Sequence, residues 1–505
     1  MQKKGTKTLP KDEFFKKTEQ LKIALTFDDV RLKSGYSKVM PEQVNLESKF
    51  SKNTPLKIPI TSAAMDTVTE HKMGIGMALL GGLGVIHRNM TPEEQASRVA
   101  RVKYFLNGVV EKPICVGENQ SIEEILKMKE EKDFSFSTFP VINDDSRLVG
   151  VLSRNDFDFC KDYSVKAKDA MSKNIIAAPK NTGLKKAYDI MVKNKKKVLP
   201  LIDKERRIKG MYVFKDAQRI IMKNPAGYNT DENGQLVAAA AIGVNDFERV
   251  EFLVQKKVNV VVIDTAHADT KSVIDTLKTI KKNYDVDVVV GNVSEKEAVR
   301  RLAKAGADGI KVGQGPGSIC TTRVVAGIGS PQVSAVYKCS QVADKYNIPI
   351  CADGGLKYSG DISIAIGAGA SNVMMGGMLS GTKEAPGDVI FKNGRQWKQY
   401  RGMGSISAME EHKSSRERYN QVSSDEKGLI AEGVEGLKPY KGRLNEVMLQ
   451  YVSGLKKGMG YVGAENIEEL QNKADFIRIS TAGKEESHPH NVLITREPPN
   501  YTIDR

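Results

Sequence analysis

The sequence predicts an α/β protein built on a (β/α)8 barrel that is interrupted by a two-part insertion, and three patterns carry this prediction. Short apolar, β-rich runs alternate with amphipathic stretches from about residue 235 onward. Two similar runs flank a helical stretch between residues 58 and 86. Between them, a gapless internal repeat occupies the middle of the chain. Alternation of this kind indicates a parallel sheet covered by helices, and an internal repeat marks a separate structural unit.

Each predicted barrel strand is short, mostly β-branched and closed by a polar residue or a glycine, which is typical of parallel strands buried on both faces. The strands are expected at residues 58–62, 84–86, 258–264, 286–292, 309–312, 348–353 and 372–376. The helices between them are expected at residues 70–80, 270–283, 294–305 and 331–346. This count is close to that of a (β/α)8 barrel.

In such a barrel the chemistry lies at the C-terminal ends of the strands. The candidates at these ends are Met65, Asp66, Asp264, Asn292, Gly313, Asp353, Gly376 and Gly377. A doubly wound open sheet is the structural alternative, and its binding fingerprint would be GxGxxG in a first βα turn. The glycine-rich segment at residues 313–317 (GQGPG) lacks that spacing.

The repeat in the middle of the chain aligns residues 139–156 with residues 199–216 without a gap. Proline, glycine and aspartate fall in register: Pro140 with Pro200, Gly150 with Gly210, and Asp156 with Asp216. Each copy is a strand, a charged turn and a second strand, and each follows a predicted helix, at residues 122–131 and 184–194. The pattern resembles a tandem pair of CBS domains.

The expected organisation therefore has four parts. Residues 1–108 form an N-terminal arm and the first part of the barrel, and residues 226–505 form the remainder with a flap and a C-terminal segment. Residues 109–165 and 166–225 form the two CBS domains, with the joints near Asn107 and Pro225. The polar, Lys-rich N-terminus is expected to be a loose arm.

Composition limits the partners. The net charge of +15 is spread over lysines mixed with acidic residues, so we expect a solvated surface and no specific nucleic-acid partner. No apolar run approaches the roughly 20 residues that span a bilayer, and the N-terminus lacks the apolar core of a secretory signal. The five scattered cysteines form no CxxC pair and favour a reducing, cytoplasmic location. The close histidines His488 and His490 lack the spacing expected of zinc ligands.

The most informative segment is residues 311–323 (KVGQGPGSICTTR), directly after a predicted strand. Its three glycines, Gly313, Gly315 and Gly317, allow close approach of a ligand, and the loop could hold an anion through N–H groups or a cation through carbonyls. Cys320 follows on a loop, where it could be an activated nucleophile. The local sequence leaves a small buried hydrophobe as an equal alternative.

Residues 315–323 (GPGSICTTR) resemble the active-site loop of the IMP dehydrogenase family, in its bacterial form. The resemblance extends along nearly the whole chain, and the repeat pair lies where that family carries CBS domains. The other matching segments are residues 25–30 (LTFDDV), 62–70 (SAAMDTVTE), 352–355 (ADGG), 373–377 (VMMGG), 400–405 (YRGMGS), 432–436 (EGVEG) and 486–490 (ESHPH).

The resemblance implies oxidation of IMP to XMP with NAD, the committed step of guanine nucleotide synthesis. Cys320 would attack C2 of IMP, and water would hydrolyse the resulting thioimidate. Thr322 would lie beside this water, which Arg418 and Tyr419 of a mobile flap would activate. The implied IMP contacts are Met65, Ser318, Asp353, Gly355, Gly376, Gly377, Tyr400, Gly402, Met403, Gly404 and Glu432.

For the cofactor, the resemblance implies NAD contacts at Asp264, Asn292 and Gly313. A potassium ion would be held by carbonyls of Gly315, Gly317 and Cys320, with Glu486, Ser487 and His488 contributed by a neighbouring subunit. A shared site of this kind implies a homotetramer, and an octamer could form through the CBS domains, which would bind adenine or guanine nucleotides. The chain departs from the family pattern at Ala268, Asp269 and Asn420.

Two other functions stay open. A GMP reductase would share the barrel and the cysteine loop but would use NADPH in the opposite direction. A nucleotide-sensing CBS protein with an inactive barrel belongs to a different class. The CBS insertion and the pair Arg418 and Tyr419 favour the dehydrogenase over the reductase, and intact Cys320 and Thr322 argue against an inactive barrel.

Overall fold

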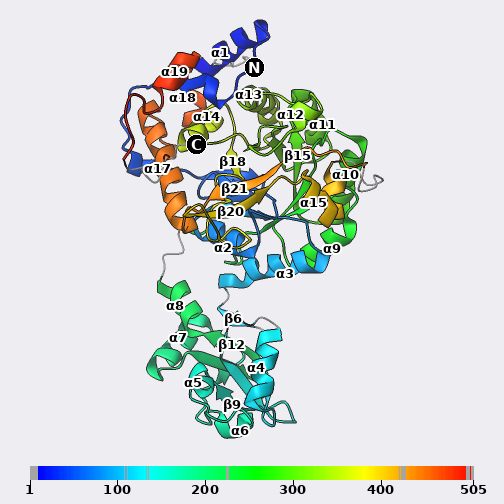
Figure 1. Ribbon diagram of the computed structural model, residues 1–505, viewed down its shortest axis with the longest axis vertical. Coiled ribbons are helices and arrows are strands. Elements are labelled where there is room, and N and C mark those ends of the chain that lie inside the picture. Colours follow the sequence, from blue (N-terminus) through cyan, green and yellow to red (C-terminus); the bar gives the residue numbers. More distant parts are fainter. Residues whose placement is uncertain are drawn as a thin grey trace, which may run out of the picture. The chain divides into compact units, whose positions relative to one another are not determined.

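The computed structural model of the 505-residue chain describes residues 9–106, 108–110, 112–131, 134, 136–222, 227–419, 421, 428–495 and 501. The chain divides into two compact units, which are described separately (Figure 1). The inserted unit is Tyr104–Ala226, and the barrel unit consists of the segments before and after it. The predicted joint residues Asn107 and Pro225 lie outside the described residues.

Eight parallel strands close a barrel, so the predicted (β/α)8 fold is confirmed. Around the barrel the order is β13-β14-β15-β16-β17-β18-β4-β5, with neighbours in the chain also neighbours in space. The strands are β4 (Ile60–Ser62), β5 (Leu83–Ile86), β13 (Ala239–Ile242), β14 (Val260–Asp264), β15 (Asp287–Val293), β16 (Gly309–Val312), β17 (Ile350–Asp353) and β18 (Asn372–Met375).

Strand β13 is the one barrel strand that the sequence did not specify. Three of its four residues are alanine, which is depleted in strands and favours helices. It pairs with β14 on one side and with β5 on the other, and thereby closes the ring after the insertion. Ala239 and Ala241 belong to the buried core together with Val260 and Val262. Tertiary context therefore decides the conformation of this segment.

Helices α2 (His71–Leu79), α3 (Pro92–Lys103), α9 (Phe247–Gln255), α10 (Lys271–Asn283), α11 (Lys296–Lys304), α13 (Gln332–Ala343) and α14 (Ser359–Gly367) belong to the barrel unit. Helix α10 shows why these segments are helical. The Thr270 side chain accepts a hydrogen bond from Val273 N at 3.3 Å and so caps the helix N-terminus. Val273, Leu277 and Ile280 recur at helical spacing and are buried.

A hairpin closes the N-terminal end of the barrel. It consists of β2 (Ser48–Ser51) and β3 (Thr54–Leu56), and its Phe50 and Leu56 are fully buried in the barrel core. Asp287, at the start of β15, accepts hydrogen bonds from Ser51 Oγ at 2.5 Å and from Asn53 Nδ2 at 2.8 Å. These contacts plug this end and leave the C-terminal end of the barrel accessible.

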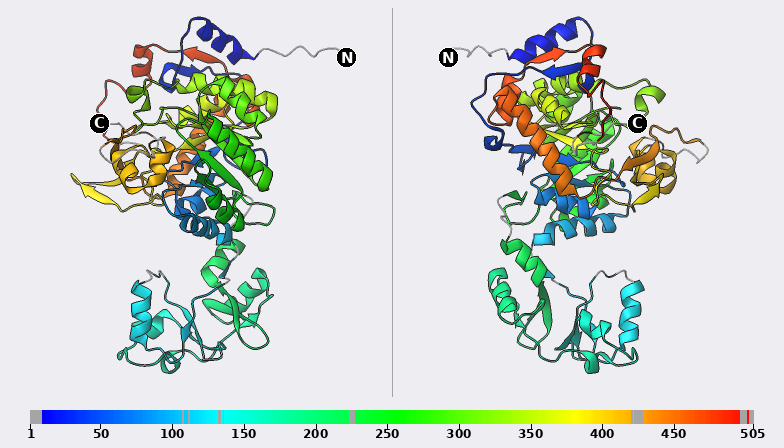
Figure 2. Two further views of the ribbon diagram at one scale, coloured as in Figure 1. Left: turned by 90° about the vertical axis from the view of Figure 1, so that its right-hand side faces the viewer. Right: turned by 60° about the vertical axis from the view of Figure 1, so that its left-hand side comes forward.

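Residues 10–20 of the predicted N-terminal arm are docked rather than loose, which corrects the sequence prediction for this part of the arm. Helix α1 (Pro10–Gln20) buries Phe15, whose ring stacks on Tyr337 of α13 with centroids 4.1 Å apart. The prediction was wrong because it rested on the many lysines of this segment and did not use its two adjacent phenylalanines, Phe14 and Phe15. The long helix α17 (Leu444–Val462) runs along the outside of the barrel unit and packs against α14 (Figure 2).

The C-terminal face of the barrel carries the remaining elements that concern the site. Helices α15 (Ile406–Glu411) and α16 (Lys413–Arg418) follow the second strand of a three-stranded sheet. This sheet consists of β19 (Ile390–Lys392), β20 (Arg395–Arg401) and β21 (Glu435–Pro439). Among the described residues, none of the helices combines the length and the apolar character that crossing a membrane requires.

The inserted unit contains two halves of the same pattern. In the first half, β7 (Val116–Gly117) runs parallel to β8 (Phe139–Ile142), which pairs antiparallel with β9 (Leu148–Leu152). In the second half, β10 (Ala178–Pro179), β11 (Val198–Ile202) and β12 (Ile208–Val213) repeat this arrangement. Helices α4 (Ile122–Glu131) and α7 (Leu184–Lys193) occupy the predicted positions. Each half has its own buried core, as the internal repeat predicts.

Candidate active site

A cavity of about 260 Å³ opens at the C-terminal ends of the barrel strands. Its wall is formed by the loops that follow β4, β14, β16, β17 and β18, by Asn292 near the end of β15, and by the segments around β20 and α16. The predicted site residues that line it are Met65, Asn292, Gly313, Gly315, Gly317, Ser318, Cys320, Thr322, Asp353, Gly355, Gly376, Gly377, Tyr400, Gly402, Met403, Arg418, Tyr419 and Glu432.

The loop after β16 carries the candidate nucleophile. It begins at Gly313, whose φ is +153° and where a Cβ atom would lie 2.1 Å from the carbonyl oxygen of Asp353, so a larger residue does not fit. The loop is held from the opposite side because Val434 N donates to the Ile319 carbonyl at 2.9 Å. Cys320 is half-buried at the cavity wall and is therefore accessible to a ligand there.

A short line of polar contacts leads away from the thiol. Cys320 Sγ lies 3.2 Å from Thr322 Oγ1, and the Thr322 hydroxyl donates to Glu432 Oε2 at 2.7 Å. The backbone fixes this arrangement, since Thr321 N donates to the Glu432 carbonyl at 3.0 Å. With its proton directed at Glu432, the Thr322 oxygen is free to accept a hydrogen bond from a group beside the thiol.

Tyr400, near the end of β20, contacts Ser318 and the backbone of Gly377 through hydrogen bonds. Burial raises the pKa of Tyr400 to about 12, so its hydroxyl stays protonated near neutral pH. Lysines Lys357, Lys438 and Lys441 also line the cavity. Hydroxyl donors, glycine-rich backbone and positive charge together form a wall that suits an anionic group.

Two carboxylates, at the ends of β14 and β17, share one buried lysine. Lys311 Nζ on β16 lies 3.0 Å from Asp264 Oδ1 and 2.7 Å from Asp353 Oδ2, and this lysine is only 1% exposed. Asn292 Nδ2 donates to Asp353 Oδ2 at 3.0 Å and to the Gly313 carbonyl at 2.7 Å. Lys311 had no predicted role, although a lysine between Ile310 and Val312 in a buried strand is a signal, because a buried charge needs partners.

The end of α16 docks onto one carboxylate of this pair, Asp264. Arg418 forms an ion pair with Asp264, and Ala266 N donates to the Arg418 carbonyl at 3.2 Å. Burial lowers the pKa of the Arg418 guanidinium, and the neighbouring Tyr419 only partly offsets this effect. Burial raises the pKa of Tyr419, whose ring packs against Gly404. The segment predicted to be a flap therefore lies over the cavity.

Three predicted residues lie elsewhere in this chain. Glu486 ends α19 (Thr481–Glu486), while Ser487 and His488 line a second cavity beside Tyr358. None of these three residues lines the cavity that contains Cys320, and the sequence prediction assigns them to a neighbouring subunit. Among the described residues, no group of three or more His, Cys, Asp or Glu side chains could hold a metal ion.

The strand-end candidate Asp66 does not line the cavity. Its carboxylate accepts from Arg401 Nη2 and from Asn89 Nδ2, each at 2.8 Å. Burial alone would raise the pKa of Asp66, but the hydrogen bond and charge of Arg401 outweigh it and hold this pKa below its usual range. The structure therefore assigns Asp66 to the scaffold that holds β20 to the barrel.

The departures from the family pattern have local partners. Ala268 is fully buried, and its N–H donates to the Asn292 carbonyl at 3.0 Å. Asp269 accepts a hydrogen bond from Arg301 Nε of α11 at 2.8 Å and forms an ion pair with it. Asn420 lies outside the described residues.

The comparisons agree with this geometry. The family model for the IMP dehydrogenase / GMP reductase domain matches residues 24–490. Inosine-5'-monophosphate dehydrogenases of Helicobacter pylori and Aquifex aeolicus are each 46% identical to this chain, over 95% and 96% of it and 99% of their own length. A crystal structure of a GMP reductase from Trypanosoma brucei in complex with guanosine 5'-monophosphate superposes with a TM-score of 0.82. It is 35% identical and covers 94% of this chain and 100% of its own.

Proposed function

This chain belongs to the IMP dehydrogenase / GMP reductase family, and we propose that it is an IMP dehydrogenase that oxidises IMP to XMP with NAD. The observation that carries the proposal is the line of contacts from the Cys320 thiol through Thr322 to Glu432 at the cavity wall. A nucleophile, a hydroxyl and a carboxylate in this order are the groups needed to form and then hydrolyse a covalent intermediate.

The IMP phosphate would lie against Ser318, Tyr400 and the backbone at the ends of β17 and β18, and Asp353 would hold the ribose. The protonated Tyr400 hydroxyl and the lysines on the cavity wall support this placement of the phosphate, because they are hydrogen-bond donors and positive charges. The proposed phosphate-end residues also include Gly355, Gly376 and Gly377. The residues proposed to surround the base are Met65, Gly402, Met403, Gly404 and Glu432.

In the reaction, the Cys320 sulfur forms a bond to C2 of IMP. When bound, NAD would supply the acceptor for the hydride that leaves C2. Water then attacks C2, the carbon–sulfur bond breaks, and the thiolate and XMP are released. Arg418 and Tyr419 would activate this water from the flap side, while Thr322, bonded to Glu432, would orient it. Docking of α16 over the cavity also excludes bulk water.

Asp264, Asn292 and Gly313 are the residues proposed to hold NAD. They fit a dinucleotide because the buried Asn292 Oδ1 has no hydrogen-bond partner among the described residues, and because a carboxylate suits ribose hydroxyls. On the adenosine side, Asp269 forms an ion pair with Arg301. The adenosine end of NAD would therefore lie beside a carboxylate whose charge Arg301 neutralises.

A potassium ion would be ligated by the carbonyls of Gly315, Gly317 and Cys320, which belong to one tight loop. The turn of this loop is held by a hydrogen bond from Cys320 N to the Gly317 carbonyl at 3.0 Å, which supports the proposal that these carbonyls lie close together. In the proposed homotetramer, Glu486, Ser487 and His488 from a neighbouring subunit would complete the site.

The inserted unit is proposed to be a pair of CBS domains that bind adenine or guanine nucleotides and regulate activity or octamer formation. Its two halves share one strand pattern, with a bulge at the same place in β8 and β11, which supports a duplicated domain. The cytoplasmic location stays a prediction.

GMP reduction is the second candidate, because the Trypanosoma brucei structure is a GMP reductase. The deciding experiment measures NADH formation from IMP and NAD with and without potassium, beside NADPH oxidation with GMP. Potassium-stimulated NADH and XMP, absent in Cys320→Ala, are expected. NADPH-dependent loss of GMP without NADH formation would assign the reductase instead. No activity in either direction would favour a nucleotide sensor with an inactive barrel.

A further inference from the structure

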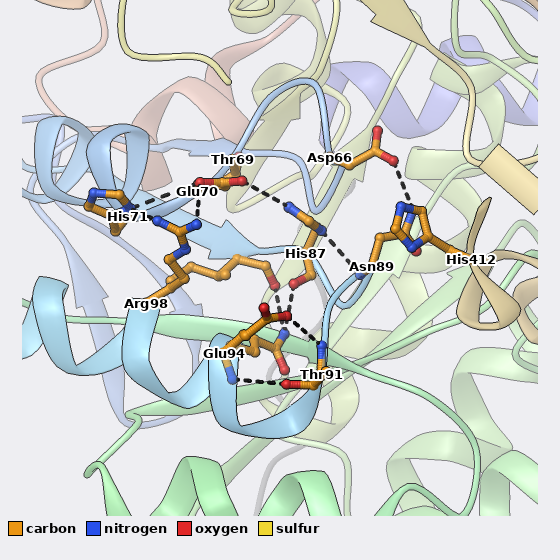
Figure 3. A network of polar contacts seen from close by, with 12 residues as sticks. Asp66, Thr69, Glu70, His71, His87, Asn89, Thr91, Glu94, Arg98 and His412 are labelled. Atoms are coloured by element: carbon orange, nitrogen blue, oxygen red, sulfur yellow. Dashed lines mark hydrogen bonds and ion pairs between the residues drawn. The ribbon is translucent and has the colours of Figure 1, made fainter. Parts of the chain in front are cut away.

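The segment at residues 87–89, directly after β5, holds the flap helix α16 through side chains that have no role in the proposed chemistry. Asn89 Oδ1 accepts hydrogen bonds from Ser414 Oγ at 2.6 Å and from Ser415 Oγ at 3.3 Å. On its other side, Asn89 Nδ2 donates to Asp66 Oδ2 at 2.8 Å (Figure 3). One amide thus joins the flap helix to the barrel scaffold.

A second contact lies next to the catalytic candidate Arg418. Arg88 Nη1 lies 2.9 Å from Glu417 Oε2, and the Arg88 side chain is only 5% exposed. Gly243, which follows β13, leaves room for this pair, because a Cβ atom there would lie 2.7 Å from Arg88 Nη1. If α16 undocked, the buried Arg88 guanidinium would lose its carboxylate partner, so this ion pair stabilises the docked position of α16.

On the barrel side, this contact belongs to a network of polar contacts (Figure 3). The His87 side chain is buried, and its Nδ1 accepts a hydrogen bond from Asn89 N at 3.1 Å. The ring proton is therefore on Nε2, which lies 3.8 Å from Glu70 Oε1. Glu70 lies 3.5 Å from Arg98 of α3, and Gln95 Nε2 donates to the His87 carbonyl at 3.0 Å. These bonds fix the direction of the residues that meet the flap.

We propose that Arg88 and Asn89 form a latch that keeps α16 docked over the cavity during hydrolysis. They act as positioning residues, because they contact Glu417, Ser414 and Ser415 rather than the reacting atoms. The docked flap places Arg418 on Asp264, which is also a proposed NAD contact, so docking and NAD occupancy exclude each other. The latch therefore sets the balance between hydride transfer and hydrolysis, an inference that rests on the proposed function.

The test uses the full-length protein with Asn89→Ala and Glu417→Gln. The matched control is Glu410→Gln, which removes an exposed carboxylate from α15 in the same segment. Stopped-flow absorbance gives the first-turnover burst of NADH, and steady-state assays give kcat and the KM for NAD. Loss of these hydrogen bonds is expected to lower kcat about tenfold and to leave the burst rate within about twofold.

The KM for NAD should fall in both latch variants, because the flap competes less well for Asp264. The double variant Ser414→Ala/Ser415→Ala should reproduce the effect of Asn89→Ala on kcat. The triple variant that combines all three changes should lose no more kcat than Asn89→Ala alone, because the three residues share one contact. Equal losses in burst rate and kcat, or the same loss in Glu410→Gln, would overturn the latch.

Hydrogen–deuterium exchange provides a measurement that does not depend on turnover. Exchange of the α16 amides should rise in the latch variants of the unliganded protein, while exchange in β5 and β13 should stay as in the unmodified protein. Unchanged exchange in α16 would overturn the latch. If the unmodified protein formed no NADH from IMP and NAD, the proposed function would fail, and the exchange result would still decide whether the latch exists.

Discussion

Replacing Lys311 by methionine tests the electrostatic centre of the site. Methionine has a similar length but cannot neutralise Asp264 and Asp353, which lie 3.0 Å and 2.7 Å from Lys311 Nζ. Removing one partner of a buried charge pair costs about 3–5 kcal/mol, because the remaining charge is left uncompensated in a region with little water. We therefore expect Lys311→Met to lower the free energy of unfolding of the barrel unit by about 4 kcal/mol.

This loss can be converted to a melting temperature. The barrel unit contains roughly 380 residues, and an unfolding entropy of about 2.1 cal/mol/K per residue gives roughly 0.8 kcal/mol/K for the unit. A loss of about 4 kcal/mol then lowers the Tm of its calorimetric transition by about 5 °C. The matched control is Lys304→Met on α11, an exposed lysine whose replacement should leave the Tm within about 1 °C.

A second replacement separates charge from packing. In Lys311→Met, Asp264 keeps its ion pair with Arg418, whereas Asp353 loses its cationic partner. Adding Asp353→Asn removes this uncompensated carboxylate and should recover part of the lost Tm. A Tm of Lys311→Met equal to that of the unmodified protein would refute the electrostatic reasoning. A double variant less stable than Lys311→Met alone would refute it as well.

Thr322→Val removes the hydroxyl between the thiol and Glu432, and kcat for NADH formation should fall about 100-fold, so an unchanged kcat would contradict the role of this hydroxyl. Because Arg401 holds the pKa of Asp66 below 3.8, this pair contributes stability that is complete above about pH 3.8 and is lost as the pH falls through the lowered pKa. Asp66→Asn should therefore flatten acid unfolding below about pH 3.8, measured by circular dichroism, and an equally steep acid limb would count against the pair. Asp269→Asn should change the unfolding free energy in urea by less than about 1 kcal/mol, because its ion pair is partly exposed; a loss of several kcal/mol would show a structural role instead.

The sequence predicts the barrel well because its strands are runs of β-branched residues with clear ends. Residues 309–312 and 258–264 needed only their composition to be recognised as strands. Ala239, Ala240 and Ala241 gave no such signal, since their strand conformation comes from pairing with β5 and β14. The docking of α1 was hidden for a related reason, because Phe15 depends on a partner ring more than 300 residues away in the chain.

The candidate site shows the same division. Residues in the loop after β16 could be assigned from their motif, because Ser318, Cys320 and Thr322 are close in sequence. Residues that act through distant partners could not be found in this way. Arg88 and Asn89 meet α16 across more than 300 residues, and local composition marks neither as a flap contact.

The most direct test of the central proposal is to look for the covalent intermediate itself. The protein is mixed with IMP and NAD, quenched in acid within the first turnover, and the peptide that contains Cys320 is examined by mass spectrometry. The account predicts one IMP-derived nucleotide attached to Cys320, with a larger amount in Thr322→Val, in which hydrolysis is slower. Two results would contradict the account: formation of XMP while Cys320 stays unmodified, or formation of XMP by the Cys320→Ala variant.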